Sequence, residues 1–149
     1  MGANGGWRRC ARRAVVGMAV ATAGLTGGRS FALDATWTAS GSGNWEVGSN
    51  WSSSPFFPTN PGDSALFPSA SATVIVSLGT PVSVAALTFN TASSYTIAQS
   101  SSGGTLILSA TSGPASIGVG NTLTAGTISV NVPIALASDL VLTNSATAV

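Results

Sequence analysis

Apolar and polar residues alternate along most of the chain beyond position 70. In the segment 128–136, every second residue from Ile128 to Leu136 is apolar, and a period of two is typical of a strand with one buried face. Apolar residues two positions apart recur at 74–78, 82–84, 87–89, 95–97, 106–108, 117–119 and 140–142. No window after Leu33 combines helical spacing with helix caps, so we expect an all-β region.

The spacing of these segments favours a solenoid. They are short and separated by Gly, Ser, Asn and Thr, which suits a sandwich, a barrel or a solenoid. Two series have similar spacing: one begins at positions 87, 106 and 128, and the other at positions 74, 95 and 117. Recurrence at intervals of roughly 20 residues predicts a parallel β-helix whose successive rungs, or turns of the solenoid, stack on one another. A β-sandwich is the alternative fold.

The segment 1–32 has the three-part plan of a secretory signal peptide. A cationic stretch from Arg8 to Arg13 precedes an apolar run at 14–25, and a polar stretch ends in Ser30-Phe31-Ala32. The small residues Ser30 and Ala32 predict cleavage between Ala32 and Leu33. The apolar run is shorter than the roughly 20 residues of a membrane-spanning helix. The arginine pair at 12–13 leaves open whether export follows the general secretory or the twin-arginine route.

Charge is divided between the leader and the remainder of the chain. All five basic residues and the one cysteine precede Phe31, whereas all four acidic residues follow it, and the chain has no histidine. The region 33–149 therefore lacks the Lys and Arg needed to bind nucleic acid or anionic lipid. Lacking thiols as well, it has no means to form disulfides and few groups for acid–base or nucleophilic catalysis. We expect no cofactor and no metal site.

Three of the four tryptophans lie in the turn-rich segment 33–68, and two of them follow an asparagine. One interpretation is a carbohydrate-binding module, in which indole faces stack on sugar rings and asparagine amides bind hydroxyls. The other, which we favour, is a cap that covers the first rung of a solenoid. The candidate ligand-binding residues of the first interpretation are Trp37, Trp45, Trp51, Asn44 and Asn50.

Glu46 and Asp63 are the candidate acid and base of a glycosidase, which needs two carboxylates flanking the scissile bond. Each lies in a Gly- or Pro-rich turn, where a solvated carboxylate or an Asx turn is expected. We therefore expect no catalytic residue and no enzymatic activity.

Several motifs, taken in order, resemble the start of bacterial proteins built from autotransporter-associated β-strand repeats. They are Gly43-Asn44-Trp45, Ser49-Asn50-Trp51, Pro61-Gly62-Asp63 and Leu87-Thr88-Phe89-Asn90. The similarity extends from about Trp37 to Leu142. It implies a right-handed β-helical passenger region, exported by a Gram-negative-type cell and displayed or released outside. Such proteins are usually far longer, so the resemblance also implies that the rungs at 69–149 are the first part of a longer solenoid.

The sequence thus predicts three regions: a signal peptide at 1–32, a Trp/Pro-rich cap segment at 33–68 and β-solenoid rungs at 69–149. The expected role is structural or adhesive, in a secreted or cell-surface protein. Expected partners are surface glycans or other cell-surface proteins, with no nucleic acid and no membrane span in the processed chain. An uncovered last rung also predicts self-association through the C-terminal end, because unpaired strand edges bind other strands.

Overall fold

The structure, a computed structural model, describes residues 31–120 and 126–147. These residues form short β-strands joined by turns, with one short 3-10 helix, η1 (Gly48–Asn50), and no α-helix among them. The all-β expectation is therefore confirmed. The segments between the strands contain many Gly, Ser, Asn, Thr and Pro residues, which favour turns and interrupt strand pairing.

The strands form three sheets, and every strand pair within them is parallel. The five-stranded sheet has the order β1 (Asp34–Thr36), β3 (Ser64–Pro68), β6 (Ala86–Asn90), β9 (Ala115–Val119) and β12 (Leu140–Asn144). The four-stranded sheet has the order β10 (Ile128–Asn131), β7 (Tyr95–Gln99), β4 (Val74–Leu78) and β2 (Gly43–Asn44). The three-stranded sheet has the order β11 (Ile134–Leu136), β8 (Leu106–Leu108) and β5 (Val82–Val84).

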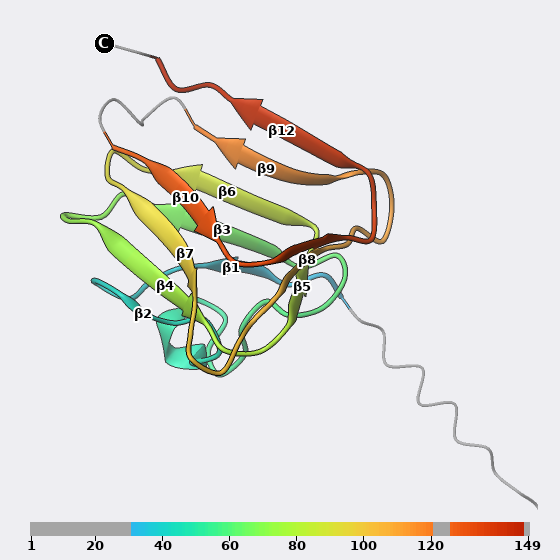
Figure 1. The fold of residues 1–149 in the computed structure, drawn as a ribbon, viewed down its shortest axis with the longest axis horizontal. Coiled ribbons are helices and arrows are strands. Elements are labelled where there is room, and N and C mark those ends of the chain that lie inside the picture. The colour runs from blue at the N-terminus through green and yellow to red at the C-terminus, as the bar shows by residue number, and fades with distance from the viewer. Residues whose placement is uncertain (1–30, 121–125, 148–149) are drawn as a thin grey trace, which may run out of the picture.

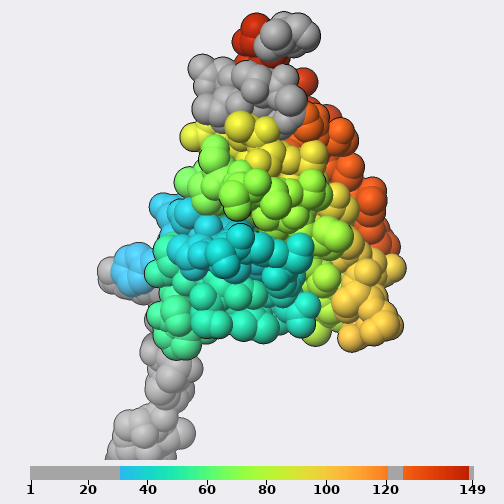
Figure 2. Space-filling model, turned by 90° about the vertical axis from the view of Figure 1, so that its left-hand side faces the viewer, coloured from blue at the N-terminus to red at the C-terminus, as the bar shows by residue number. Residues whose placement is uncertain are grey.

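From β3 onward the chain visits these sheets repeatedly in the same order. The strands β3, β4 and β5 belong to the five-, four- and three-stranded sheets in turn, and so do β6, β7 and β8, and then β9, β10 and β11. We call one such passage a round. Each round stacks on the one before it (Figure 1), and the space-filling view accordingly shows bands of colour in sequence order (Figure 2). An all-β arrangement of this kind is compatible with a β-helix or solenoid.

The strand pairing between rounds differs from the regular spacing expected from the sequence. Tyr95 pairs with Val74, as the second series predicts, but on its other side it pairs with Ile128. Ile117, expected in the same series as Tyr95, instead pairs with Leu87 in another sheet. The equivalent connections from the five-stranded to the four-stranded sheet differ in length: the segment 91–94 joins β6 to β7, whereas the longer segment 120–127 joins β9 to β10. Strand pairing is thus preserved while the interval between paired strands varies.

The inward-facing residues of the first two rounds form the core. Phe67, Leu87 and Phe89 of the five-stranded sheet are fully buried, as are most apolar residues at alternate positions of β4, β5, β7 and β8. β1 and β3 carry the five-stranded sheet into the segment 33–68, and β3 ends at Pro68. The sheet therefore runs from the segment with the tryptophans directly into the repeated rounds.

The segment 128–136 departs from the single strand with one buried face. It forms two strands, β10 and β11, in different sheets, separated at Val132 and Pro133. Proline lacks the amide hydrogen that would continue a ladder, which accounts for the break. Ile134 and Leu136 are 46% and 59% exposed, and Leu142 of β12 is 69% exposed. The strands β10, β11 and β12 are each the last in their sheet, so no described strand covers these side chains.

Candidate functional site

The three candidate tryptophans lie together in the interior. Trp37, Trp45 and Trp51 are at most 1% exposed. The ring centroids of Trp45 and Trp51 lie 4.8 Å apart and those of Trp37 and Trp51 5.1 Å apart, both with edge-to-face geometry. All three contact Phe67 of β3, with centroid distances of 5.7 to 6.2 Å. These four rings, which we call the aromatic cluster, bury a large apolar area in an arrangement that aromatic pairs favour.

Each indole N–H donates to a backbone carbonyl of the same segment. Trp45 Nε1 donates to the oxygen of Pro58 at 2.8 Å, and Trp51 Nε1 to the oxygen of Trp45 at 2.7 Å. Trp37 Nε1 makes a longer bond, of 3.4 Å, to the oxygen of Gly41. The rings are thereby fixed in place as well as buried, because a buried N–H without a partner would be costly.

The two candidate asparagines do not form a ligand site with these rings. Asn44 is exposed at the end of β2, and Asn50 Nδ2 donates to the backbone oxygen of Asn44 at 2.9 Å. This bond closes the loop between the two Asn-Trp pairs. The interpretation as a sugar platform needs exposed ring faces beside free amides. The structure instead covers the indole faces of Trp37, Trp45 and Trp51 with protein, so that interpretation loses its contact surface.

Glu46 is hydrogen-bonded to the turn between β4 and β5. Its Oε1 accepts the backbone N–H groups of Gly79 and Thr80 at 2.6 and 2.8 Å, and Thr80 Oγ1 at 3.3 Å. The carboxylate thus supplies acceptors to two amides that lie at the end of a strand. This arrangement ties the segment 33–68 to the first round.

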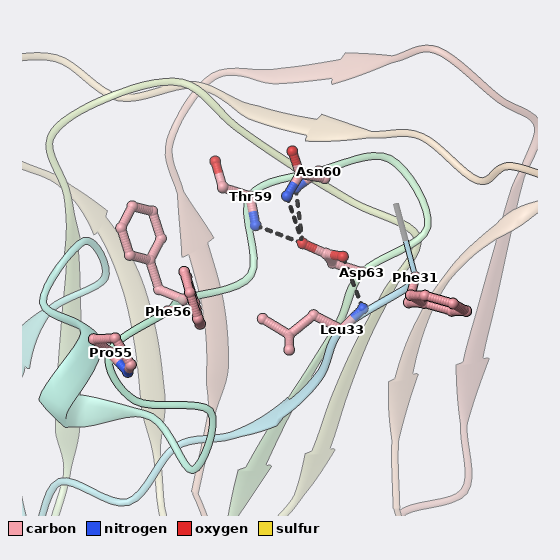
Figure 3. A pocket seen from close by; sticks show the side chains of 8 residues that line it. Phe31, Leu33, Pro55, Phe56, Thr59, Asn60 and Asp63 are labelled. Atoms are coloured by element: carbon pink, nitrogen blue, oxygen red, sulfur yellow. Dashed lines mark hydrogen bonds between the residues drawn. The ribbon is translucent and has the colours of Figure 1, made fainter. Parts of the chain in front are cut away.

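Asp63 is buried, contrary to the expectation of a solvated carboxylate. It is 0% exposed and lies directly before β3. Its Oδ2 accepts the backbone N–H groups of Thr59 and Asn60, both at 2.9 Å, and its Oδ1 accepts that of Leu33, also at 2.9 Å (Figure 3). Gly62, with φ of +95°, makes the turn that brings this carboxylate inward.

A cavity of about 540 Å³ lies beside Asp63. Its lining is mostly apolar and comprises Phe31, Leu33, Pro55, Phe56, Phe57, Thr59, Asn60 and Asp63 (Figure 3). Phe31 and Phe56 are 80% and 68% exposed, so the cavity opens to solvent between exposed side chains. The one carboxylate in it is already bonded to three backbone amides, which leaves little polar surface to orient a ligand.

The predicted cleavage site lies at the margin of the described structure. Ala32 is exposed, and Leu33 is half-buried with its backbone N–H bonded to Asp63. Neither hydrophobic periodicity nor turn chemistry reveals this contact, because the two residues are 30 positions apart. The Pro-Gly-Asp motif was the available signal, and it indicated only a turn at Asp63.

The remaining titratable group in the core is Tyr95. Its hydroxyl donates to the backbone oxygen of Pro68 at 2.9 Å, and desolvation by burial raises its pKa above the ordinary value of 10.0. A neutral phenol with a bonded hydroxyl is typical of a structural residue. Among residues 31–120 and 126–147, no buried side-chain polar atom lacks a hydrogen-bond partner.

The part of the chain that the structure describes contains no group of three or more His, Cys, Asp or Glu side chains placed to bind a metal ion. The same residues contain no helix of the length and hydrophobicity required to cross a membrane. The class that fold and site define is an all-β protein of parallel sheets with a buried aromatic cluster. The sequence matches no protein-family model, and comparisons with curated proteins and with solved structures find no match.

Proposed function

We propose that the chain is exported, is cleaved between Ala32 and Leu33, and forms a right-handed parallel β-solenoid with a structural or adhesive role. We assign it to the secreted or cell-surface passenger regions built from autotransporter-associated β-strand repeats. Surface glycans or other cell-surface proteins are its proposed partners, and it is proposed to have no catalytic activity.

The repeated order of the three parallel sheets carries this proposal. A sandwich is built mainly from antiparallel strands joined by short hairpins or Greek-key connections. Three successive rounds through the same three parallel sheets are compatible with a solenoid, which buries its core by stacking neighbouring repeats. The right-handed sense follows from the strong preference of parallel strands for right-handed crossover connections.

The aromatic cluster supports a capping role for the segment 33–68. β1 is the edge strand at the N-terminal end of the five-stranded sheet. The residue that follows β1 is Trp37, which forms an isolated β-bridge with Trp51. Phe67 stacks on Phe89 of the next round, with centroids 4.9 Å apart and planes inclined at 14°. The indoles therefore continue the aromatic core of the rounds instead of facing solvent. Terminal caps of this kind protect a solenoid core from water.

The carboxylates support a non-catalytic role. Glu46 holds the amides of Gly79 and Thr80, and Asp63 holds three further backbone amides. A glycosidase requires two carboxyl groups that face one scissile bond. Both carboxylates instead accept hydrogen bonds from backbone N–H groups of their own chain.

Engineered cysteine pairs test the solenoid. Thr96 and Ser129 are paired in the parallel ladder between β7 and β10, and neighbouring strands lie about 4.8 Å apart, within reach of a disulfide. Since the chain has no cysteine after Cys10, T96C/S129C is expected to form one intramolecular disulfide on oxidation, detected by mass spectrometry. The matched control T96C/S116C places the second cysteine in another sheet and should stay reduced. Oxidation of the control alone would favour a different fold.

Surface exposure and glycan retention test the role. Expressed in a Gram-negative host, an epitope-tagged full-length chain should appear outside the inner membrane, in the medium or accessible to protease on intact cells. The product should not be retained on neutral or acidic polysaccharides through its tryptophans, because their faces are buried. Retention that is abolished by W51A in a folded protein would favour the carbohydrate-binding module. A chain that stays in the cytoplasm would contradict the proposal.

A further inference from the structure

Asp63 combines full burial with an all-neutral set of hydrogen-bond donors. The carboxylate accepts the backbone N–H groups of Leu33, Thr59 and Asn60, and Asn60 Nδ2 lies 3.4 Å from its Oδ2. A buried negative charge is strongly stabilised by an opposite charge in direct contact. No Lys, Arg or His follows Arg29 in the sequence, so no side chain of region 33–149 can supply that charge.

The donor that differs from the others is the nitrogen of Leu33, because it is the atom released by the proposed cleavage. Hydrolysis breaks the bond between the carbonyl carbon of Ala32 and the nitrogen of Leu33. Water supplies the hydroxyl of the new Ala32 carboxyl group and a proton for the new amine. At neutral pH the amine takes up a further proton and becomes an ammonium group. An atom 2.9 Å from Asp63 Oδ1 thus changes from a neutral amide to a cation.

We propose that Asp63 is the binding site for the new α-ammonium group of Leu33, and that this partly buried ion pair locks the processed chain. The inference rests on the cleavage site in the proposed function. The pair joins the residue that precedes β1 to the residue that precedes β3, at the start of the five-stranded sheet. Ser64 N–H, which donates to the oxygen of Leu33 at 2.8 Å, holds the same residue from its other side.

The other Asp and Glu side chains of region 33–149 are engaged elsewhere or exposed. Asp34 is exposed and accepts the hydroxyl of Ser64, Glu46 binds the turn at Gly79, and Asp139 is exposed before β12. The α-ammonium group would therefore be the one cation of the processed chain, placed against its most buried carboxylate. In the precursor the same contact is a hydrogen bond from a neutral amide to the carboxylate. Cleavage adds a full positive charge to the donor, and with it a direct Coulomb attraction between the two groups. Removal of the leader would thus strengthen the contact that anchors β1.

The absence of lysine makes this pair directly measurable. The full chain is exported from a Gram-negative host, and the N-terminus of the purified product is sequenced. Its one amine is then acetylated at neutral pH with an N-hydroxysuccinimide ester, folded and in denaturant, and the reaction is followed by intact mass. A neighbouring carboxylate favours the unreactive ammonium form, and one unit of pKa lowers the free amine tenfold. We expect the folded amine to react at least about tenfold more slowly than the unfolded amine.

Two variants identify the carboxylate responsible. D63N should react at nearly the unfolded rate, whereas the matched control D34N, at the neighbouring exposed carboxylate, should keep the slow rate. If D63N does not fold, the wild-type protein is acetylated in denaturant and refolded. Blocking the amine should then lower the thermal midpoint of the Asp63 protein relative to the unblocked product.

The outcomes separate the inference from its premise. A product that begins at Leu33 but whose folded amine reacts as fast as the unfolded one overturns the ion pair and leaves the proposed export and cleavage intact. Slow labelling that persists in a folded D63N also overturns it. A product that begins at Met1 or at another residue overturns the proposed cleavage, and the inference with it.

Discussion

The two ends of the stacked sheets differ sharply in how their apolar residues are covered. At the end formed by β1 and β2, Trp37, Trp45 and Trp51 are buried against Phe67 and bonded through their indole N–H groups. At the end formed by β10, β11 and β12, Leu136 is 59% exposed although it pairs in register with a buried residue of β8. Both ends carry alternating apolar residues, so alternation alone does not determine burial. Burial requires a neighbouring layer, which the segment 33–68 supplies at one end only.

The largest expected contrast comes from truncating one large apolar side chain at each end. Trp45→Ala empties a site that is 0% exposed and removes a buried hydrogen bond to Pro58. We expect it to lower the free energy of unfolding by about 3–5 kcal/mol. Leu142→Ala, at a residue that is 69% exposed, should change it by less than about 0.5 kcal/mol. Urea unfolding followed by tryptophan fluorescence measures both. Equal effects would contradict the difference between the ends.

An added methyl group should likewise be less well tolerated at the covered end than at the exposed end. A Cβ at Gly48 would lie 1.9 Å from the backbone oxygen of Pro55, which cannot move aside without reshaping the loop. Gly48→Ala should therefore destabilise by about 1–3 kcal/mol. A Cβ at Gly118 of β9 meets only Thr143 Oγ1, at 3.1 Å, the end of an exposed side chain. Gly118→Ala should stay within about 0.5 kcal/mol of the parent in the same urea titration. A tolerated alanine at 48 would show that the loop is not tightly packed.

Association should occur through the exposed end. The processed chain, from Leu33, is expected to self-associate at micromolar concentration, because β10, β11 and β12 present unpaired strand edges beside exposed apolar side chains. Analytical ultracentrifugation measures the oligomeric state. The double variant L136K/L142K should raise the dissociation constant at least about tenfold, a change of about 1.4 kcal/mol, whereas the matched F56K, at an exposed residue near the other end, should not. A monomeric parent, or dissociation caused by F56K alone, would place the contact elsewhere.

The smallest effect concerns Tyr95, which lies next to Phe67 and so extends the aromatic cluster into the second round. Its pKa is raised by desolvation from the ordinary value of 10.0. The Tyr95 phenol therefore ionises first in the unfolded chain, so its contribution to stability is constant below about pH 10 and falls as the pH rises above it. Tyr95→Phe should lose this alkaline fall, at a cost of about 1 kcal/mol at neutral pH for the lost bond to Pro68. Denaturant midpoints across the alkaline range, together with tyrosinate absorbance, test it. A parent whose stability does not fall in that range would contradict the prediction.

Local patterns predicted the strands better than their partners. The alternation at 74–78, 82–84 and 95–97 marked strands with buried alternate residues, and the structure contains them. The pairing of Tyr95 with Val74 also follows the expected interval, but its pairing with Ile128 does not. The interval depends on connections whose lengths vary, and single-sequence spacing gives no means to separate a long connection from a missing strand. Proline at 133 was a visible signal for the break between β10 and β11 that the periodicity obscured.

The sequence identified the residues of the candidate site but not how they contact one another. The three tryptophans at 37–51 marked an unusual segment. The sequence alone, however, does not distinguish an exposed tryptophan from a buried one. In the structure the three rings pack against one another and against Phe67 of β3, a residue later in the sequence. Asp63 likewise was recognised as a turn residue. Its contact with Leu33 arises only when β1 pairs with β3.

The sequence by itself determined the strand-forming alternation, the placement of every basic residue before Phe31 and the absence of thiols and side-chain amines after it. These are properties of residue identity and order. Tertiary structure alone decided which alternating residues are covered and which carboxylate is buried. Both depend on contacts between residues far apart in the sequence, formed when parallel strands align in register. An isoleucine side chain is consequently buried at Ile97 of β7, which has a strand on each side, and exposed at Ile134 of β11, which is unpaired on one side.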